Sequence, residues 1–160
     1  MRATALICLG AGAGLIGSEL RQISGRDVTR RSGGLVVGVG GRRARAVPVL
    51  ARFGAPLEEA ARFAGDRCLL GGSDPERRNL TAALNAALSR DAGLPRLQPA
   101  RLRATWLCEC ARLIGLGAFM KAAGVRCSQR LGDLVAELPA VEEETAMVLL
   151  GGTGGGQGAA

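Results

Sequence analysis

The sequence predicts an α+β fold that is mostly helical and carries a small antiparallel β-hairpin sheet. Apolar residues recur at helical spacing over 78–90 and 100–113. Two runs rich in β-branched residues, 35–39 and 42–50, flank Gly40-Gly41, a typical hairpin signal. The length of 160 residues and an apolar content of 48% suit one domain with a packed core.

The N-terminal half contributes the predicted hairpin and two shorter elements. Residues 2–13 are apolar and fit either a short helix or a buried strand, because periodicity does not separate the two in so short a run. Residues 18–23 predict a short helix with Ser18 as its N-cap, followed by a turn-rich piece over 25–34. Pro48 places the second hairpin strand at an edge or ends it there.

The C-terminal half is predicted to be largely helical. Residues 55–64 have a proline and acidic side chains near the start, as helices do, and 67–72 predict a small strand. Further helices are expected over 78–90, 100–113, 116–123, 128–138 and 140–150, with a linker at 94–99 and a flexible glycine-rich tail at 151–160. In the helix 100–113 the side chains predicted to face the core are Leu102, Trp106, Ala111 and Ile114.

Positive charge is concentrated in the first 130 residues. They carry 21 basic and nine acidic side chains, whereas residues 131–160 carry five acids and no base. All basic residues except Lys121 are arginines, whose planar fork suits phosphate groups. A basic body indicates a polyanionic partner, nucleic acid first, although an Ala-, Gly- and Arg-rich composition also arises from a GC-rich genome.

The composition excludes several kinds of site. The chain has no His and no Tyr, which removes every histidine acid, base or metal ligand and every tyrosine nucleophile. Its five cysteines are dispersed and odd in number, which favours buried thiols in a reducing cytoplasm over disulfides. No metal, no cofactor and no membrane span are expected, since no apolar run reaches the length that a span needs.

One short motif suggests a nucleotide cofactor instead. GAGLIG at 12–17 satisfies the G-x-G-x-x-G pattern of dinucleotide-binding turns, and ALICL before it could form the required strand. The supporting context is missing, because a hairpin follows in place of a second βα unit and no acid closes a second strand. An NAD(P)-binding oxidoreductase of the Rossmann type is therefore the alternative interpretation, beside a small helical interaction protein.

Four segments in order carry a more specific resemblance. They are AGLIGSELRQISGRDV at 13–28, GLVVGVGGRRARAVPVL at 34–50, LQPARLRATWL at 97–107 and LGAFMKAAGVRCSQRLGDL at 116–134. Together they resemble the catalytic domain of the tyrosine recombinases, or phage integrases, colinearly over residues 3–138. The resemblance implies a recombinase-like domain over 1–138, without the upstream DNA-binding domain, then a C-terminal helix over 139–150 and a disordered tail over 151–160.

The departures from this family concern its chemistry. The resemblance places the family's first catalytic Arg at Ile16, its hairpin Lys near Gly40, its two His at Ala100 and Val125, and its Tyr nucleophile near Leu134. Arg103 alone stands where a catalytic Arg is expected, as a vestigial member, and Glu19 would support it by holding an Arg or capping a turn. Trp106 is expected in the core.

The resemblance implies a DNA-binding protein of the recombination and integration family, cytoplasmic and derived from a mobile element, that has lost strand cleavage. DNA is the expected partner, bound weakly and without sequence preference, and the candidate DNA-binding side chains are Arg42, Arg43, Arg45, Arg96 and Arg101. Residues 139–150 combine apolar side chains with glutamates and are expected to dock onto a second copy or a partner recombinase, away from phosphate.

Overall fold

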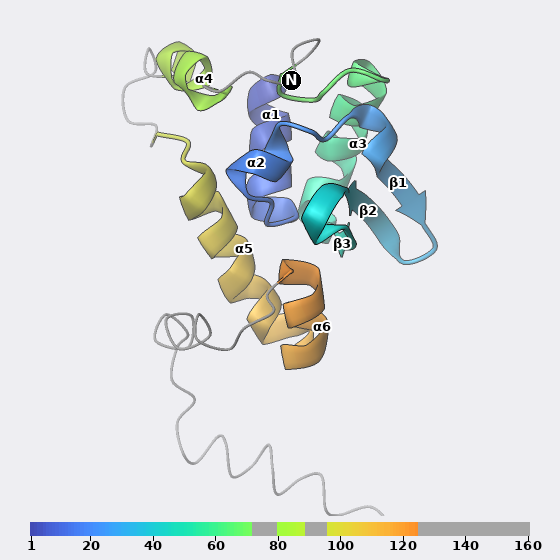
Figure 1. Cartoon of the computed structure of the whole chain (residues 1–160). Coiled ribbons are helices and arrows are strands. Elements are labelled where there is room, and N and C mark those ends of the chain that lie inside the picture. Colours follow the sequence, from blue (N-terminus) through green and yellow to red (C-terminus); the bar gives the residue numbers. More distant parts are fainter. Residues whose placement is uncertain (72–79, 89–95, 125–160) are drawn as a thin grey trace, which may run out of the picture. The chain divides into compact units, whose positions relative to one another are not determined.

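The structure is a computed structural model that describes residues 1–71, 80–88 and 96–124 (Figure 1). Its elements are α1 (Arg2–Ile7), a π-helical turn (Cys8–Gly12), α2 (Gly17–Leu20), β1 (Val28–Arg31), β2 (Gly34–Val39), β3 (Arg45–Pro48), α3 (Gly54–Ala64), α4 (Leu80–Leu88), α5 (Pro99–Leu113) and α6 (Gly115–Ala123). Short 3₁₀ turns occupy Gly25–Asp27, Gly41–Arg43 and Ala51–Phe53. The predicted helices over 128–138 and 140–150 and the predicted tail lie outside the described residues.

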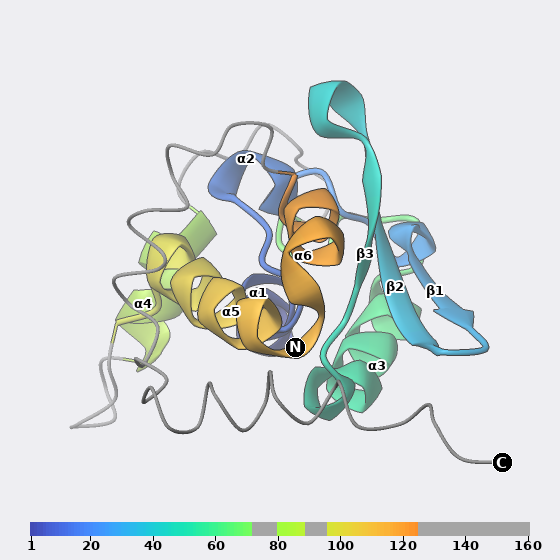
Figure 2. The same cartoon turned by 90° about the horizontal axis from the view of Figure 1, so that it is seen from below.

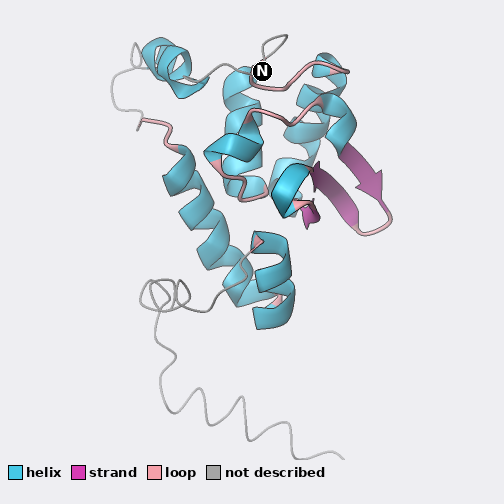
Figure 3. Ribbon diagram, in the orientation of Figure 1, coloured by secondary structure: helices cyan, strands magenta, loops and turns pink. Residues whose placement is uncertain are grey.

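The fold class is confirmed: helices predominate, and the sheet has three antiparallel strands in the order β1-β2-β3 (Figure 3). The predicted hairpin is formed by β2 and β3, with Val37 opposite Val47. Strand β1 was missed, because its sequence VTRR lies in a stretch that predicts turns and three of its four side chains are exposed. Leu35, Val37 and Val39 alternate toward the core, as the period of a strand requires.

The N-terminal segment is a helix rather than a strand. Helix α1 runs into the π-helical turn Cys8–Gly12, and every residue of that turn is buried. The glycines let α5 and the turn Ala51–Phe53 lie directly on this segment: a Cβ on Gly10 would be 2.7 Å from Leu102 Cβ, and one on Gly12 would be 2.7 Å from Phe53 Cβ. Gly12 of GAGLIG thus serves packing, and the strand that a dinucleotide-binding turn needs is absent from residues 1–17.

Two other local predictions are wrong. Helix α2 begins one residue before Ser18, with Ile16 as its N-cap, because the Glu19 carboxylate reaches back to the Ile16 backbone N–H. Residues 67–72 form no strand over their described part. Cys68 makes only an isolated bridge with Ser24, and the Leu69 N–H donates to the Ile23 carbonyl at 2.9 Å.

Helix α5 is the long helix of the second half, and α6 packs against it after a sharp corner (Figure 1). Trp106 is buried, which confirms its predicted place in the core, whereas Ile114 is 42% exposed. Ile114 ends α5 and precedes α6, so it leaves the helical spacing that predicted its burial. Figure 2 shows α6 beside β3 and α3 beside the sheet, in agreement with the contacts between these elements.

In the described part of the chain, no helix is long and apolar enough to cross a membrane. The described cysteines, Cys8, Cys68, Cys108 and Cys110, are free thiols. No group of three or more carboxylates or thiols there is arranged to hold a metal ion.

Gly14 is the glycine whose replacement should damage this packing most. Its φ of +62° lies in the left-handed region, and an added Cβ would come within 2.1 Å of Cε3 of Trp106. We expect Gly14→Ala to lower the free energy of unfolding by about 2–4 kcal/mol, from overpacking together with backbone strain. Urea denaturation followed by Trp106 fluorescence measures this loss.

Gly17→Ala is the matched control, because a Cβ at Gly17 meets no heavy atom within 4 Å. It should leave stability unchanged or slightly higher, as alanine favours the helix. Equal losses in the two variants would show that the close approach of Gly14 to Trp106 does not limit the fold.

Candidate nucleic-acid interface

Glu19 is a buried charged residue, with 7% of its surface exposed. Its carboxylate accepts hydrogen bonds from Nη1 of Arg45 at 2.6 Å and from Nη2 of Arg45 at 3.2 Å. It also accepts the backbone N–H of Ile16 at 2.9 Å, which fixes the start of α2. A buried carboxylate is tolerated because a bidentate guanidinium compensates its charge.

Arg45 is correspondingly inaccessible, with 7% of its side chain exposed. Besides Glu19, its guanidinium donates to the carbonyl oxygens of Ala122 at 2.9 Å and Arg43 at 3.1 Å. Arg45 was predicted to bind DNA, but its guanidinium donates to Glu19 and to backbone carbonyls of the chain itself.

The carbonyls at the C-terminal end of α6 accept hydrogen bonds from Arg43, Arg45 and Arg103. Nη2 of Arg43 donates to the carbonyl oxygens of Ala123 and Gly124, each at 3.0 Å. Arg103, from α5, donates through Nη2 to Ala123 O at 2.9 Å and through Nη1 to Gly14 O. Carbonyls at a helix C-terminus lack partners in the helix and carry partial negative charge, so cations there are stabilising.

These contacts also determine the ionisation of Glu19. Burial alone would raise the pKa of Glu19, but the hydrogen bonds from Arg45 and Ile16, and the positive charges of Arg45 and Arg43, outweigh it. The pKa of Glu19 therefore lies below its ordinary value, and the carboxylate is ionised at neutral pH.

Glu19, Arg43, Arg45 and Arg103 form an arginine cluster at the end of α6. An open pocket of about 460 Å³ adjoins this cluster. One side of the pocket is formed by Arg43 and the start of β3, and the other side by the end of α6. Among the residues that the structure describes, its charged lining residues are Arg43, Arg45 and Lys121, and none of the lining residues is acidic. Arg43 keeps 37% of its side chain exposed, and Lys121 and Arg42 are exposed. We call Arg42, Arg43 and Lys121 the basic surface. Lys121 was not among the predicted site residues, although it is the sole lysine of the sequence.

The remaining predicted site residues lie elsewhere. Arg96, in the segment before α5, and Arg101, in the first turn of α5, are exposed, and neither lines the open pocket. Arg101 is two residues before Arg103 and so points about 200° away around the helix. Because Arg103 points into the fold, Arg101 faces away from the cluster.

The positions expected to hold other catalytic groups carry none of them. Ile16 is the N-cap of α2, Gly40 precedes the turn Gly41–Arg43, and Ala100 is exposed in the first turn of α5. Val125 and Leu134 lie outside the described residues. The first catalytic arginine was expected at position 16, which is Ile16. The arginine that pairs with Glu19 is Arg45 from β3.

The buried thiols are poor nucleophiles. Burial raises the pKa of Cys8 to about 11. Burial, and to a smaller extent the charge of Glu109, raises the pKa of Cys110 to about 11 as well. Both are therefore protonated at neutral pH, and a thiol rather than a thiolate does not attack phosphate or carbonyl groups.

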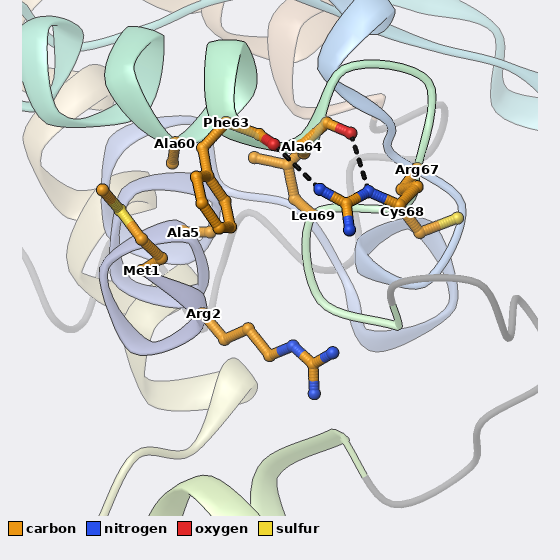
Figure 4. Close-up of a pocket in the computed structure, with 9 residues that line it drawn as sticks. All are labelled: Met1, Arg2, Ala5, Ala60, Phe63, Ala64, Arg67, Cys68 and Leu69. Atoms are coloured by element: carbon orange, nitrogen blue, oxygen red, sulfur yellow. Dashed lines mark hydrogen bonds between the residues drawn. The ribbon is translucent and has the colours of Figure 1, made fainter.

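A second pocket lies between α1 and the end of α3 (Figure 4). Phe63 and Met1 line it and are exposed, and Arg67 donates to the carbonyl oxygens of Phe63 at 3.0 Å and Ala64 at 3.3 Å. Its volume of about 60 Å³ holds only a few water molecules. It is a much weaker candidate than the pocket between β3 and α6.

Comparison with known proteins shows that the fold is similar to that of a transposon integrase. No protein-family model and no curated protein matches the chain. Among solved structures, the Tn1549 transposon integrase in complex with circular-intermediate DNA matches with a TM-score of 0.56 and 14% identity, over 94% of this chain and 59% of the integrase chain. A variant of that integrase with transposon right-end DNA gives a TM-score of 0.57 over 58% of its chain, again at 14% identity.

These matches confirm a recombinase-like fold, as the sequence resemblance implied. The chain spans less than two thirds of the integrase chains that it matches. Dinucleotide-binding proteins are not among these matches, and the helical N-terminal segment does not support that alternative.

Removing the charge of Glu19 should destabilise the protein through the arginine cluster. We expect Glu19→Gln to lower the free energy of unfolding by about 3 kcal/mol at neutral pH, since it leaves the Arg45 charge buried without its partner. Chemical denaturation measures the loss. Glu58→Gln is the matched control, because Glu58 makes an exposed ion pair with Arg30, and we expect a much smaller change.

The loss should depend on pH in a defined direction. Because the pKa of folded Glu19 lies below the ordinary value of 4.5, the pair stabilises the fold fully above pH 4.5. That stabilisation disappears as the pH falls through the lower folded pKa, so the gap between wild type and Glu19→Gln should narrow on acidification. A gap that is constant from neutral to acidic pH would contradict an ionised Glu19.

Proposed function

We propose that the chain binds duplex DNA as a protein of the site-specific recombination and integration family and does not cleave it. The observation that carries the proposal is the open pocket lined by Arg43 and Lys121, on a fold shared with integrases in complex with DNA. Cations on a helix end and on a neighbouring turn suit a phosphate backbone.

The mode of binding follows from the side chains available. Arg42, Arg43 and Lys121 are cations, and cations contact phosphates without reading base sequence unless they enter a groove. We therefore expect weak binding, with a Kd of the order of 10⁻⁴ to 10⁻⁶ M at physiological salt, and little sequence preference.

The absence of cleavage rests on chemistry. The sequence has no Tyr, so it cannot form a phosphotyrosine intermediate, and no His, so it lacks an imidazole acid or base. Arg103, which stands where the resemblance expects a catalytic Arg, donates to the carbonyls of Gly14 and Ala123 instead of facing an open site. A charge clamp on a reacting phosphate needs several preorganised donors, which this arrangement does not supply.

The proposal extends to the setting of the protein. A mobile-element origin and a cytoplasmic location fit a DNA-binding member of this family. We also propose that the recombinase-like part extends to residue 138, and that residues 139–150 contact a second copy or a partner recombinase. Their run of three glutamates, flanked by apolar side chains, supports a protein partner over a phosphate backbone.

The basic surface should dominate DNA affinity. We expect Arg42→Ala/Lys121→Ala to weaken binding to a mixed-sequence duplex and to reduce the slope of log K against log salt by about 1 for each phosphate contact removed. Arg31→Ala/Arg62→Ala removes the same charge from exposed positions on β1 and α3, away from the pocket. Fluorescence anisotropy over a salt series compares both with the wild type.

The control variant should lose much less affinity than the basic-surface variant. Equal losses would mean that net charge, and not this surface, attracts DNA. An affinity of the wild type that did not change with salt would contradict phosphate contact altogether.

The protein should form no covalent intermediate with DNA. A suicide duplex, nicked so that cleavage releases a short strand, traps any recombinase that attacks its backbone. We expect no protein–DNA adduct after denaturing electrophoresis, because no residue of the chain supplies a phenol. An adduct that survives denaturation would overturn this part of the proposal.

A further inference from the structure

Arg43 has two roles that the other arginines at the end of α6 do not combine. Arg45 is buried and pairs with Glu19, while Arg43 keeps 37% of its side chain exposed and lines the open pocket with Lys121. At the same time Arg43 bonds two carbonyls at the end of α6. It is thus both part of the basic surface and a support of the helix.

The donors of Arg43 divide between these roles. Nη2 has two hydrogens, and the carbonyl oxygens of Ala123 and Gly124 accept from it at 3.0 Å each. Nε lies 3.9 Å from Oε1 of Glu19, which is an ion-pair distance rather than a hydrogen bond. Nη1 makes no hydrogen bond to any part of the chain that the structure describes. A ligand in the open pocket can therefore use Nη1 without displacing the contacts to α6.

Gly124 allows the guanidinium of Arg43 to lie against the end of α6. Gly124 has a φ of +64° and ends α6, and a Cβ there would lie 3.1 Å from Nη2 of Arg43. The guanidinium therefore lies close against the end of the helix, where its position and the order of the last turn depend on each other. A long side chain that is half exposed loses rotamer freedom when it is held in this way, at a cost in entropy.

We propose that DNA binding and the order of the last turn of α6 are coupled through Arg43. This inference rests on the proposed DNA binding. A phosphate held by Nη1 of Arg43 fixes the same guanidinium whose Nη2 holds Ala123 O and Gly124 O. The Arg43 side chain then loses its conformational entropy only once, although it makes both the phosphate contact and the contacts to α6. Each of these two interactions therefore strengthens the other. By linkage, an ordered α6 also raises the affinity for DNA.

The experiment is hydrogen–deuterium exchange of the full chain with and without a saturating mixed-sequence duplex. In the wild type, exchange in the peptide that contains α6 should slow by about fivefold on binding, the lower end of usual coupling between sites. In Arg43→Lys, a single ammonium cannot span two carbonyls and a phosphate as a planar fork does, so at saturating DNA the slowing should disappear. Arg31→Lys, an exposed position on β1, is the matched control and should behave as the wild type.

The outcomes separate this inference from the proposed function. If DNA binds but α6 is not protected, or if Arg43→Lys keeps the protection, the coupling is wrong while DNA binding stands. Slowing of the same size in α3, which lies outside the basic surface, would also overturn it, because the effect would then be global. If the wild type binds no DNA even at low salt, the proposed function itself fails. Equal exchange of α3 in the free wild type and free Arg43→Lys shows that the variant is folded.

Discussion

The ion pair between Glu19 and Arg45 connects the parts of this fold. Glu19 lies at the start of α2 and holds the Ile16 N–H, while Arg45 begins β3 and holds the Ala122 carbonyl at the end of α6. Segments far apart in sequence therefore meet at one carboxylate. Removing these two charges from water is costly, and only the bidentate geometry with further hydrogen bonds from Arg45 compensates it.

The arginines of this molecule fall into two groups, those that bind within the fold and those that stay exposed. Arg45 and Arg103 act as internal hydrogen-bond donors to backbone carbonyls, and Arg52 pairs with Glu109 on the surface. Such arginines add to the formal net charge of +7 but offer little to an external anion. In the proposed DNA binding, the charge that matters is the smaller part that stays exposed beside the open pocket, on the turn Gly41–Arg43 and on α6.

The glycine-rich N-terminal segment shows why a short motif needs its structural context. GAGLIG satisfies a dinucleotide-binding pattern, yet Gly12 and Gly14 are required because Phe53 and Trp106 lie against them. Close packing on a helical turn and close approach to a pyrophosphate both select residues without a Cβ. The sequence signal is therefore the same for two unrelated purposes, and only the preceding element, helix or strand, distinguishes them.

The sequence by itself determined the fold class, the hairpin of β2 and β3, the helices α3, α5 and α6 and the burial of Trp106, because these follow from local periodicity and turn residues. It also excluded histidine and tyrosine chemistry outright. Tertiary structure decided that β1 pairs as a strand, that Ile114 is exposed at a helix corner, and that Arg45 is the partner of Glu19. Those outcomes depend on contacts between segments distant in sequence, and periodicity along the chain carries no information about which carbonyl or carboxylate an arginine will reach.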